Sequence, residues 1–220
     1  MTRWLYNDVH LRGEIADDGE AMSLSHAAWQ ALTAGTATRY TSDGWKIEPG
    51  PDRCFRASRN GLELLVPEED AGLWVEGDGR LRLVRYRPNA LFGWHVFVGR
   101  FGGPVRSSVR LYLPELAGPE PLVALVNSLD DSDIVWSGKL AANEGSRRPD
   151  RLVLYLDAEA VDDIVRTVRM VRESFGPLPM RAPGFAVDVR DGVPGARGTD
   201  DGAGRSHGMT VASGFARALC

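Results

Sequence analysis

Residues 135–156 read VWSGKLAANEGSRRPDRLVLYL, and they contain two apolar stretches separated by a turn rich in glycine and arginine. The first stretch belongs to the segment DIVWSGKL (133–140), and the second is RLVLYL (151–156). Short apolar runs bounded by turn residues are typical of buried β-strands. We therefore expect both segments to be strands of the same sheet, with Lys139 near the end of the first.

The flanking segments extend this pattern into a series of strands and helices. VRLYL (109–113) and FAVDVR (185–190) have the lengths of strands, and EPLVALVNSL (120–129) has the pattern of a short amphipathic helix. Residues 157–175 predict a long helix with these apolar residues on one face: Val161, Ile164, Val165, Val168 and Val171. The order β-α-β-β-α-β predicts an α+β fold of the split β-α-β type, with an antiparallel or mixed sheet and helices on one face.

The amino-terminal part has a different pattern. The segment SLSHAAWQALTAG (23–35) begins at a serine cap and ends at glycine, which predicts a helix. Four short segments bounded by turns follow and predict antiparallel hairpins: 52–59, 62–67, 72–77 and 81–87. We expect residues 1–87 to form a small helix-plus-hairpin subdomain and residues 88–220 the main domain. The stretch 88–108 mixes aromatic residues with Gly and Pro, which favours a packed loop or a hinge.

The composition is that of an ordinary globular protein, since 43% of the 220 residues are hydrophobic and 25% are charged. With a net charge of −4 and a pI near 5.6, the chain has no global field that would attract nucleic acid or an anionic membrane. No apolar run approaches the ~20 residues of a spanning helix, and no secretion signal is recognisable, so we expect a cytoplasmic protein. Cys54 and Cys220 fit neither a metal site nor a disulfide framework, and we interpret both as structural.

The chain contains 24 arginines but only two lysines, Lys46 and Lys139. A high-GC coding bias accounts for this scarcity, and it makes each remaining lysine more informative. Lys46 lies in an expected hairpin turn and should be exposed, whereas Lys139 precedes a group of arginines. A glycine-rich loop with Arg205, Ser206 and His207 leads into a final helix, and the unpaired N–H groups of such a loop make it a natural anion cradle.

Four motifs occur in order between residues 86 and 219: R-x-Y, a lysine at a strand end, R-x-D-x-x-V-L-Y, and the loop GRSHG before the last helix. They correspond to Arg110 with Tyr112, Lys139, Arg148 with Asp150 and the run Val153, Leu154 and Tyr155, and finally Arg205, Ser206, His207 and Gly208. This order resembles the HopA-type effector domain, a family known from plant-pathogen type III effectors and from actinobacterial gene clusters for class V lanthipeptides and thioamitides. His207 stands where that family commonly has an aromatic residue.

The resemblance implies a role beside a peptide kinase. In the peptide pathways the kinase phosphorylates Ser or Thr of a ribosomal precursor, and the HopA-type protein is implicated in eliminating phosphate to leave dehydroalanine or dehydrobutyrine. The expected function is therefore that of a phosphoserine/phosphothreonine lyase. Its expected partners are the phosphorylated precursor peptide and its kinase, without nucleic acid or membrane.

Such a β-elimination needs a base for the Cα proton, cations for the departing phosphate and a donor for the leaving oxygen. Lysine can act as the base only where burial or neighbouring positive charge lowers its pKa, whereas arginine stays protonated and is the better phosphate clamp. The expected catalytic residues are Lys139 and His207. Phosphate binding is expected from Arg110, Arg148, Arg151 and Arg205, with support from Tyr112, Asp150 and Ser206. No metal or cofactor is expected, because the sequence has no HExxH or CxxC motif.

Other interpretations stay open at this point. Lys139 is equally a surface cap at a strand end, and Arg148 and Arg151 fit a solvated turn in which Asp150 is an ion-pair partner. His207 fits an ordinary helix cap. For the whole protein, the alternatives are a non-catalytic module that binds the precursor peptide or the kinase at a strand edge, and an effector-like protein that only engages cellular proteins.

Overall fold

A computed structural model describes residues 18–59, 62–70, 75, 79–91, 93–104, 109–142, 148–176 and 182–198. Three α-helices and three antiparallel sheets lie within these residues. Short 3₁₀ helices cover Glu68–Asp70 (η2), Pro114–Leu116 (η3) and Ala158–Ala160 (η5). The expected α+β class is therefore confirmed.

A seven-stranded sheet organises the larger part of the molecule, with the strand order β11-β12-β8-β10-β9-β7-β6. Every neighbouring pair is antiparallel. In chain order its strands are β6 (Tyr86–Leu91), β7 (Trp94–Val98), β8 (Val109–Tyr112), β9 (Trp136–Ala141), β10 (Leu152–Leu156), β11 (Val187–Arg190) and β12 (Val193–Arg197). The two segments that open the sequence analysis are β9 and β10, and they pair with each other as expected.

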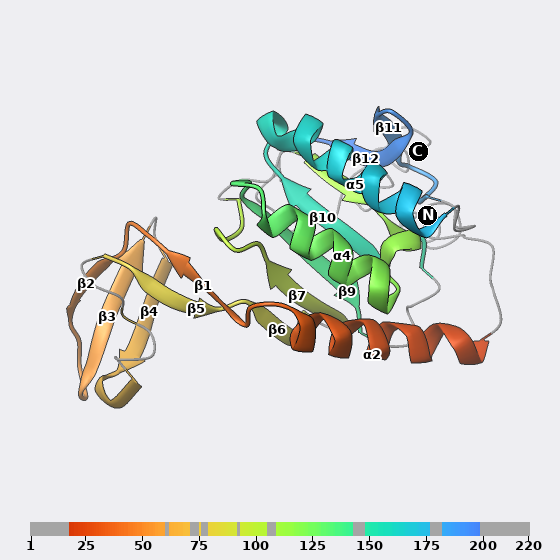
Figure 1. Cartoon of the computed structure of the whole chain (residues 1–220). Coiled ribbons are helices and arrows are strands. Elements are labelled where there is room, and N and C mark those ends of the chain that lie inside the picture. Colours follow the sequence, from red (N-terminus) through yellow and green to blue (C-terminus); the bar gives the residue numbers. More distant parts are fainter. Residues whose placement is uncertain are drawn as a thin grey trace, which may run out of the picture.

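Helices cover one face of this sheet (Figure 1). α4 (Pro119–Asp130) and α5 (Val161–Phe175) pack against each other, and α2 (Asp18–Gly35) packs beside α4. Proline at the start of α4 suits a helix, because its missing N–H falls where no intrahelical bond would form. The predicted apolar stripe of α5 is buried, and it includes Val161, Ile164 and Val168.

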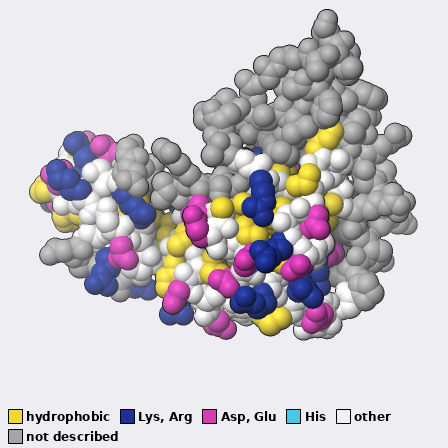
Figure 2. Space-filling view, turned by 90° about the horizontal axis from the view of Figure 1, so that it is seen from above, with side chains coloured by type: hydrophobic (Ala, Val, Ile, Leu, Met, Phe, Trp, Pro, Cys, Tyr) yellow, Lys and Arg dark blue, Asp and Glu magenta, His cyan; other side chains and the backbone are white. Residues whose placement is uncertain are grey.

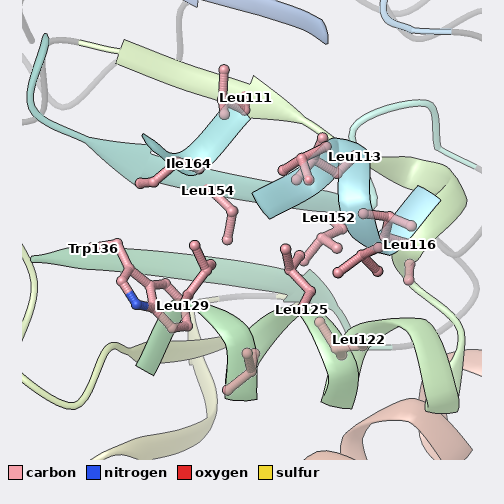
Figure 3. Close-up of a cluster of buried hydrophobic side chains, with 14 of the residues drawn as sticks. Leu111, Leu113, Leu116, Leu122, Leu125, Leu129, Trp136, Leu152, Leu154 and Ile164 are labelled. Atoms are coloured by element: carbon pink, nitrogen blue, oxygen red, sulfur yellow. The ribbon is translucent and has the colours of Figure 1, made fainter. Parts of the chain in front are cut away.

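The main hydrophobic core lies between the helices and the sheet. Every second residue of β10 enters it, namely Leu152, Leu154 and Leu156, and each has no exposed surface. Figure 3 shows leucines of α4, including Leu125 and Leu129, facing the sheet across this core. Burying a leucine or isoleucine side chain contributes ~1.5–3 kcal/mol, so this layer holds most of the stability of the fold.

Two smaller sheets lie to one side of the main sheet (Figure 1). One contains β2 (Lys46–Pro49), β3 (Cys54–Arg59) and β4 (Leu62–Pro67), and the other pairs β1 (Arg39–Ser42) with β5 (Leu81–Val84). A separate small core of Trp45, Ala57, Leu81 and Leu83 holds them together. The preceding helix α2 instead contributes Ala28, Trp29 and Leu32 to the main core, and the expected domain boundary at residue 87 stays a prediction.

Two local features differ from what the sequence predicted, namely the stretch 88–108 and β12. The stretch 88–108, expected as a loop or hinge, supplies most of β6 and all of β7, because Trp94–Val98 alternates inward and outward side chains and Gly93 turns the chain at φ +74°. Of the expected hairpin strand 72–77, Val75 alone lies within the described residues, and it forms an antiparallel bridge to Leu81; the rest of this expectation lies outside the described residues. β12 was not expected, since Pro194 and Gly195 weaken a strand pattern. Gly195 is required there, because a β-carbon would lie 2.2 Å from the carbonyl oxygen of Arg110.

Candidate functional site

The face of the main sheet opposite the helices carries Lys139, and we call it the lysine face. Lys139 alternates along β9 with Gly138 and Leu140, which belong to the helix side. A methyl group at Gly138 would lie 2.6 Å from the ring of Phe97, so glycine leaves that ring its place in the core. The alternation of a β-strand therefore directs Lys139 away from the core.

The strand register places other residues of the lysine face beside Lys139. One row across the sheet runs from Arg87 through Val96, Lys139 and Val153 to Tyr112. The next row runs Val98, Ser137, Tyr155, Arg110 and Ala196. Arg110 and Tyr155 are thus direct cross-strand partners; Tyr155 lies one strand away from the lysine and Arg110 lies two strands away.

The side chains of this face converge on two aromatic rings. The Nζ of Lys139 lies 4.0 Å from the centre of the Trp94 ring and 5.9 Å from that of Tyr155. The guanidinium carbon of Arg148 lies 4.9 Å from the Trp94 ring, and that of Arg110 lies 5.7 Å from the Tyr155 ring. We call Trp94, Arg110, Lys139, Arg148, Asp150 and Tyr155 the lysine cluster.

Asp150 orients Arg148 within this cluster. The Nε of Arg148 donates a hydrogen bond to one carboxylate oxygen of Asp150 at 2.8 Å, and a terminal nitrogen donates to the other at 3.0 Å. Only 6% of the Asp150 side chain is exposed. Such a paired, partly desolvated fork holds a guanidinium in one orientation. The expected ion pair within this turn is therefore present, and it fixes Arg148 over Trp94.

The amine of Lys139 is the group most altered by this surrounding. The pKa of Lys139 is lowered from 10.5 to about 8, mainly by burial; the carboxylate of Asp150 opposes this shift, and the guanidinium groups of Arg148 and Arg110 add to it. A lysine with a pKa of about 8 holds a neutral amine in roughly one molecule in ten at pH 7. Lys139 is therefore able to accept a proton while two arginines stay charged beside it.

The arrangement combines the functions that elimination of an acidic leaving group requires. A neutral amine can remove a weakly acidic proton, and Arg110 and Arg148 can bind an anion at the same place. Trp94 is 8% exposed, and its indole covers one side of the Lys139 amine. The same arrangement, without a reaction, is an anion-binding site on a sheet.

The structure brings together some of the residues that the sequence predicted, but not all. Lys139, Arg110, Arg148 and Asp150 belong to one cluster. Tyr112 lies on the same face and packs in a small apolar group with Val153 and Ala196.

Arg151 lies outside the lysine cluster in a buried position, and its expected role in phosphate binding stays a prediction. It is 9% exposed, its Nε donates a hydrogen bond to the carbonyl of Pro114 at 2.7 Å, and Glu115 is the charged group that acts on it. Burial lowers the pKa of Arg151, the largest influence on this group. This contact with Pro114 ties the start of β10 to η3. Arg205, Ser206 and His207 lie outside the described residues.

Trp94 and Tyr155 were not predicted as site residues. Tyr155 follows Val153 by two positions, so the alternation of β10 alone places it on the lysine face. Trp94 reaches the site from β7, in a stretch that was expected to be a loop. Its position follows from pairing with Ala141, two residues beyond Lys139, and this register cannot be read from one sequence.

Other titratable residues are accounted for by packing or by exposed ion pairs. Lys46 lies at the start of β2, where its exposed side chain pairs with Glu48 at 2.7 Å. His95 stacks on Trp29 with ring centres 4.2 Å apart, and burial lowers its pKa. No group of three or more His, Cys, Asp or Glu able to hold a metal occurs within the described ranges.

A polar hollow between α5 and β11 is the main alternative site. Its lining includes Arg166, Arg169, Arg190, Asp162 and Asp191. These charges pair with one another, as in Arg190 with Asp162 at 2.5 Å and Arg169 with Asp191 at 3.5 Å. Figure 2 shows basic and acidic side chains interspersed across this side of the described surface. The hollow therefore has balanced charge and does not select an anion.

Comparison with protein-family models gives no match, and comparison with curated proteins gives no similar sequence. The likeness to the HopA-type domain therefore rests on the motifs alone. None of the helices in the described part of the chain is long and apolar enough to cross a membrane.

Proposed function

We propose that this protein is a phosphoserine/phosphothreonine lyase, which eliminates phosphate from a kinase-phosphorylated precursor peptide and leaves dehydroalanine or dehydrobutyrine. The observation that carries the proposal is the pKa of the Lys139 amine. It is lowered to about 8, close to neutral pH, and the guanidinium groups of Arg148 and Arg110 contribute to this shift. The proposed partners are the precursor peptide and its Ser/Thr kinase, and both place the protein in the cytoplasm. Neither a metal nor a cofactor takes part in the proposed steps.

The reaction begins with the phosphate bound by Arg110 and Arg148. The neutral amine of Lys139 takes the proton from Cα of the phosphorylated residue and becomes an ammonium. The electron pair of the broken C–H bond forms the Cα=Cβ double bond, and the Cβ–O bond breaks. The departing oxygen takes a proton from His207, so a phosphate dianion of the ester leaves as HPO₄²⁻.

Three features of the lysine cluster support this assignment. The lysine is desolvated, as a base with a neutral amine must be, whereas an ordinary strand cap is solvated. The cations beside it are arginines, whose paired donors match two phosphate oxygens. Asp150 is saturated by Arg148, so it orients that guanidinium and is not itself available as a base.

The fold offers a second, coarser support. In the main sheet β12, β8, β10 and β9 are neighbours in that order, with α4 between β8 and β9 and α5 after β10. This is the order that a split β-α-β fold requires, and we propose that the domain has this architecture, extended at one edge by β7 and β6 and at the other by β11.

The test uses the full chain and synthetic peptides with one phosphoserine or one phosphothreonine. Phosphate release and the matching mass loss from the peptide are measured, and the new double bond is trapped with a thiol. We expect release with the wild-type protein, no release with Lys139→Met, and wild-type release with Lys46→Met, which removes the other lysine. Release by Lys139→Met would exclude the proposed base.

Binding without elimination would favour the non-catalytic alternative. A protein that binds phosphopeptide tightly, releases no phosphate at any pH between 7 and 9, and loses binding in Arg148→Ala would be an anion-recognition module for the same precursor. Measuring both phosphate release and peptide binding therefore distinguishes a lyase from a non-catalytic binding module.

A further inference from the structure

Arg87 extends the basic row of the lysine face beyond the lysine cluster. It lies on β6, opposite Val96 of β7, and Val96 in turn lies opposite Lys139 of β9. Tyr86, its neighbour in sequence, is in the core on the other face. Arg87 is exposed, so its guanidinium is available on the same surface as the proposed reaction.

The register fixes the spacing between the two cations. Neighbouring strands lie ~4.8 Å apart, so the backbone positions of Arg87 and Lys139 are separated by about 10 Å across the sheet. A peptide in the polyproline II conformation advances ~3.1 Å for each residue and turns the same side to the sheet at every third residue. A peptide that places its phosphorylated residue at Lys139 therefore brings the side chain about three residues away to Arg87.

Tyr40, in the strand that begins the small sheets, lies within electrostatic range of Arg87. The charges of both Arg87 and Arg59 act on the phenol of Tyr40, which is half-buried. The ring of Tyr40 lies against Gly102, where an added β-carbon would be 3.2 Å away, and the adjacent Gly103 lies against Ser137 of the lysine face. Burial raises the pKa of the Tyr40 phenol, so this hydroxyl keeps its proton near neutral pH. We call Tyr40, Arg59 and Arg87 the neck cluster.

Acidic side chains do not balance the neck cluster within the described part of the chain. Arg59 donates a hydrogen bond to the hydroxyl of Ser42 at 2.8 Å, and no described carboxylate forms an ion pair with Arg59 or Arg87. Arg56, on the opposite face of the same strand as Arg59, does have such a partner in Glu63 at 3.5 Å. The neck cluster thus offers two guanidinium groups and a phenolic donor to an incoming anion.

We propose that the neck cluster is a specificity site for a carboxylate of the substrate peptide, an Asp or Glu about three residues from the phosphorylated residue. This inference rests on the proposed function, because the lysine cluster defines where the phosphorylated residue lies. A carboxylate is the matching ligand, since two guanidinium groups and a hydroxyl can donate to its two oxygens. A precursor with acidic residues spaced around its Ser or Thr sites would engage both clusters at once.

The test titrates the full chain with phosphoserine peptides that carry Asp, Asn or Lys at each position up to four residues away on both sides. Binding is measured with Lys139→Arg, which keeps the charge without the proposed base, and elimination with the wild type. We expect Asp at the third position on one side to bind about 5-fold tighter than Asn, as for a partly exposed charged pair. Lys at that position should bind more weakly than Asn.

Variants of Arg87 give the decisive comparison. Arg87→Gln should remove the preference for Asp, and Arg87→Glu should reverse it in favour of Lys, whereas the control Arg56→Gln should keep it. A preference that survives in Arg87→Glu, or equal binding of all three peptides by the wild type, would overturn the specificity site. If the preference is present in binding but no peptide is eliminated, the specificity site stands and the lyase proposal fails.

Discussion

The two faces of the main sheet are built from the same strands but have different tasks. On β10, Leu152, Leu154 and Leu156 are fully buried under the helices, while Val153 and Tyr155 lie on the lysine face. On β9, Trp136 and Leu140 enter the core, while Ser137 and Lys139 point the other way. Neighbouring residues of one strand therefore serve different purposes: one packs in the core and stabilises the fold, and the next faces the candidate site.

The difference is one of solvation as much as of position. The helix face is apolar and fully buried, so substitutions there should change stability. The lysine face keeps cations against aromatic rings in a partly desolvated setting, so substitutions there should change binding and reaction while the fold persists. Substitutions and titrations on the two faces separate these roles.

Replacing Lys139 by arginine should have the largest effect. Arg keeps the positive charge that attracts phosphate but cannot hold a neutral amine near pH 7, and a general base contributes about 10²–10⁴-fold to a rate. We expect elimination to fall by that factor, while the Kd for phosphopeptide stays within about 3-fold. Turnover at the wild-type rate in Lys139→Arg would remove this lysine as the base and direct attention to His207 or Lys46.

Leu154→Ala tests the helix-covered face of the sheet at a fully buried position of β10. Truncating a fully buried leucine should lower the free energy of unfolding by about 2–5 kcal/mol, because the cavity cannot be filled. The measurement is denaturant unfolding followed by circular dichroism. Ser137→Ala, on the lysine face of the next strand, should change the free energy of unfolding by less than about 0.5 kcal/mol. Equal losses in both variants would show that the two faces do not divide as described.

Arg148→Lys should weaken binding more than it slows the reaction. The substitution keeps one charge but loses the fork that Asp150 orients, at a cost of about 1–3 kcal/mol, which raises the Kd for phosphopeptide roughly 5- to 150-fold. Isothermal titration with Lys139→Arg as background gives the Kd without turnover. An unchanged Kd would mean that Arg148 serves only its ion pair with Asp150.

The pH dependence gives a smaller but specific effect. With a pKa of about 8 for Lys139, kcat/KM should rise with pH and level off above a midpoint near 8. Because the carboxylate of Asp150 raises the pKa of Lys139, Asp150→Asn should move this midpoint to lower pH. A midpoint that moves upward in Asp150→Asn would contradict the assigned electrostatics.

The lowered pKa of Lys139 also affects the stability of the fold, because the lysine has its ordinary pKa in the unfolded chain. The folded pKa of Lys139 lies below its unfolded value of 10.5, so the unfolded chain binds more protons between about pH 8 and 10.5. The contribution of Lys139 therefore makes the free energy of unfolding rise with pH across this window. Comparing the wild type with Lys139→Met over that range isolates it.

Strong periodicity explains which parts of the fold could be predicted. α5 has a clear apolar stripe, and β9 and β10 are short apolar runs, so all three were found from sequence. β7 was missed because glycines on both sides of Trp94–Val98 look like loop signals. β12 was missed because Pro194 and Gly195 conceal a strand that tertiary packing imposes.

Site residues could be predicted where alternation within one strand determines which face they occupy. They could not be predicted where their position depends on how two strands pair. Arg110 and Lys139 follow from alternation within their own strands. Trp94 lies over Lys139 only because β7 pairs with β9 in one register. Arg151 was expected beside Arg148, yet its contact with Pro114 follows from the path of the chain after the turn. Arg87 escaped notice for the same reason as Trp94.

The most direct test of the account is the titration of the Lys139 amine itself. The chain has two lysines, so protein labelled with ¹³C at lysine Cε gives two NMR signals, which Lys46→Arg and Lys139→Arg assign. We predict that the Lys139 signal titrates with a midpoint of about 8. A midpoint close to the ordinary lysine value of 10.5 would show that Lys139 is a solvated ammonium, and the proposed base, with the reaction built on it, would be contradicted.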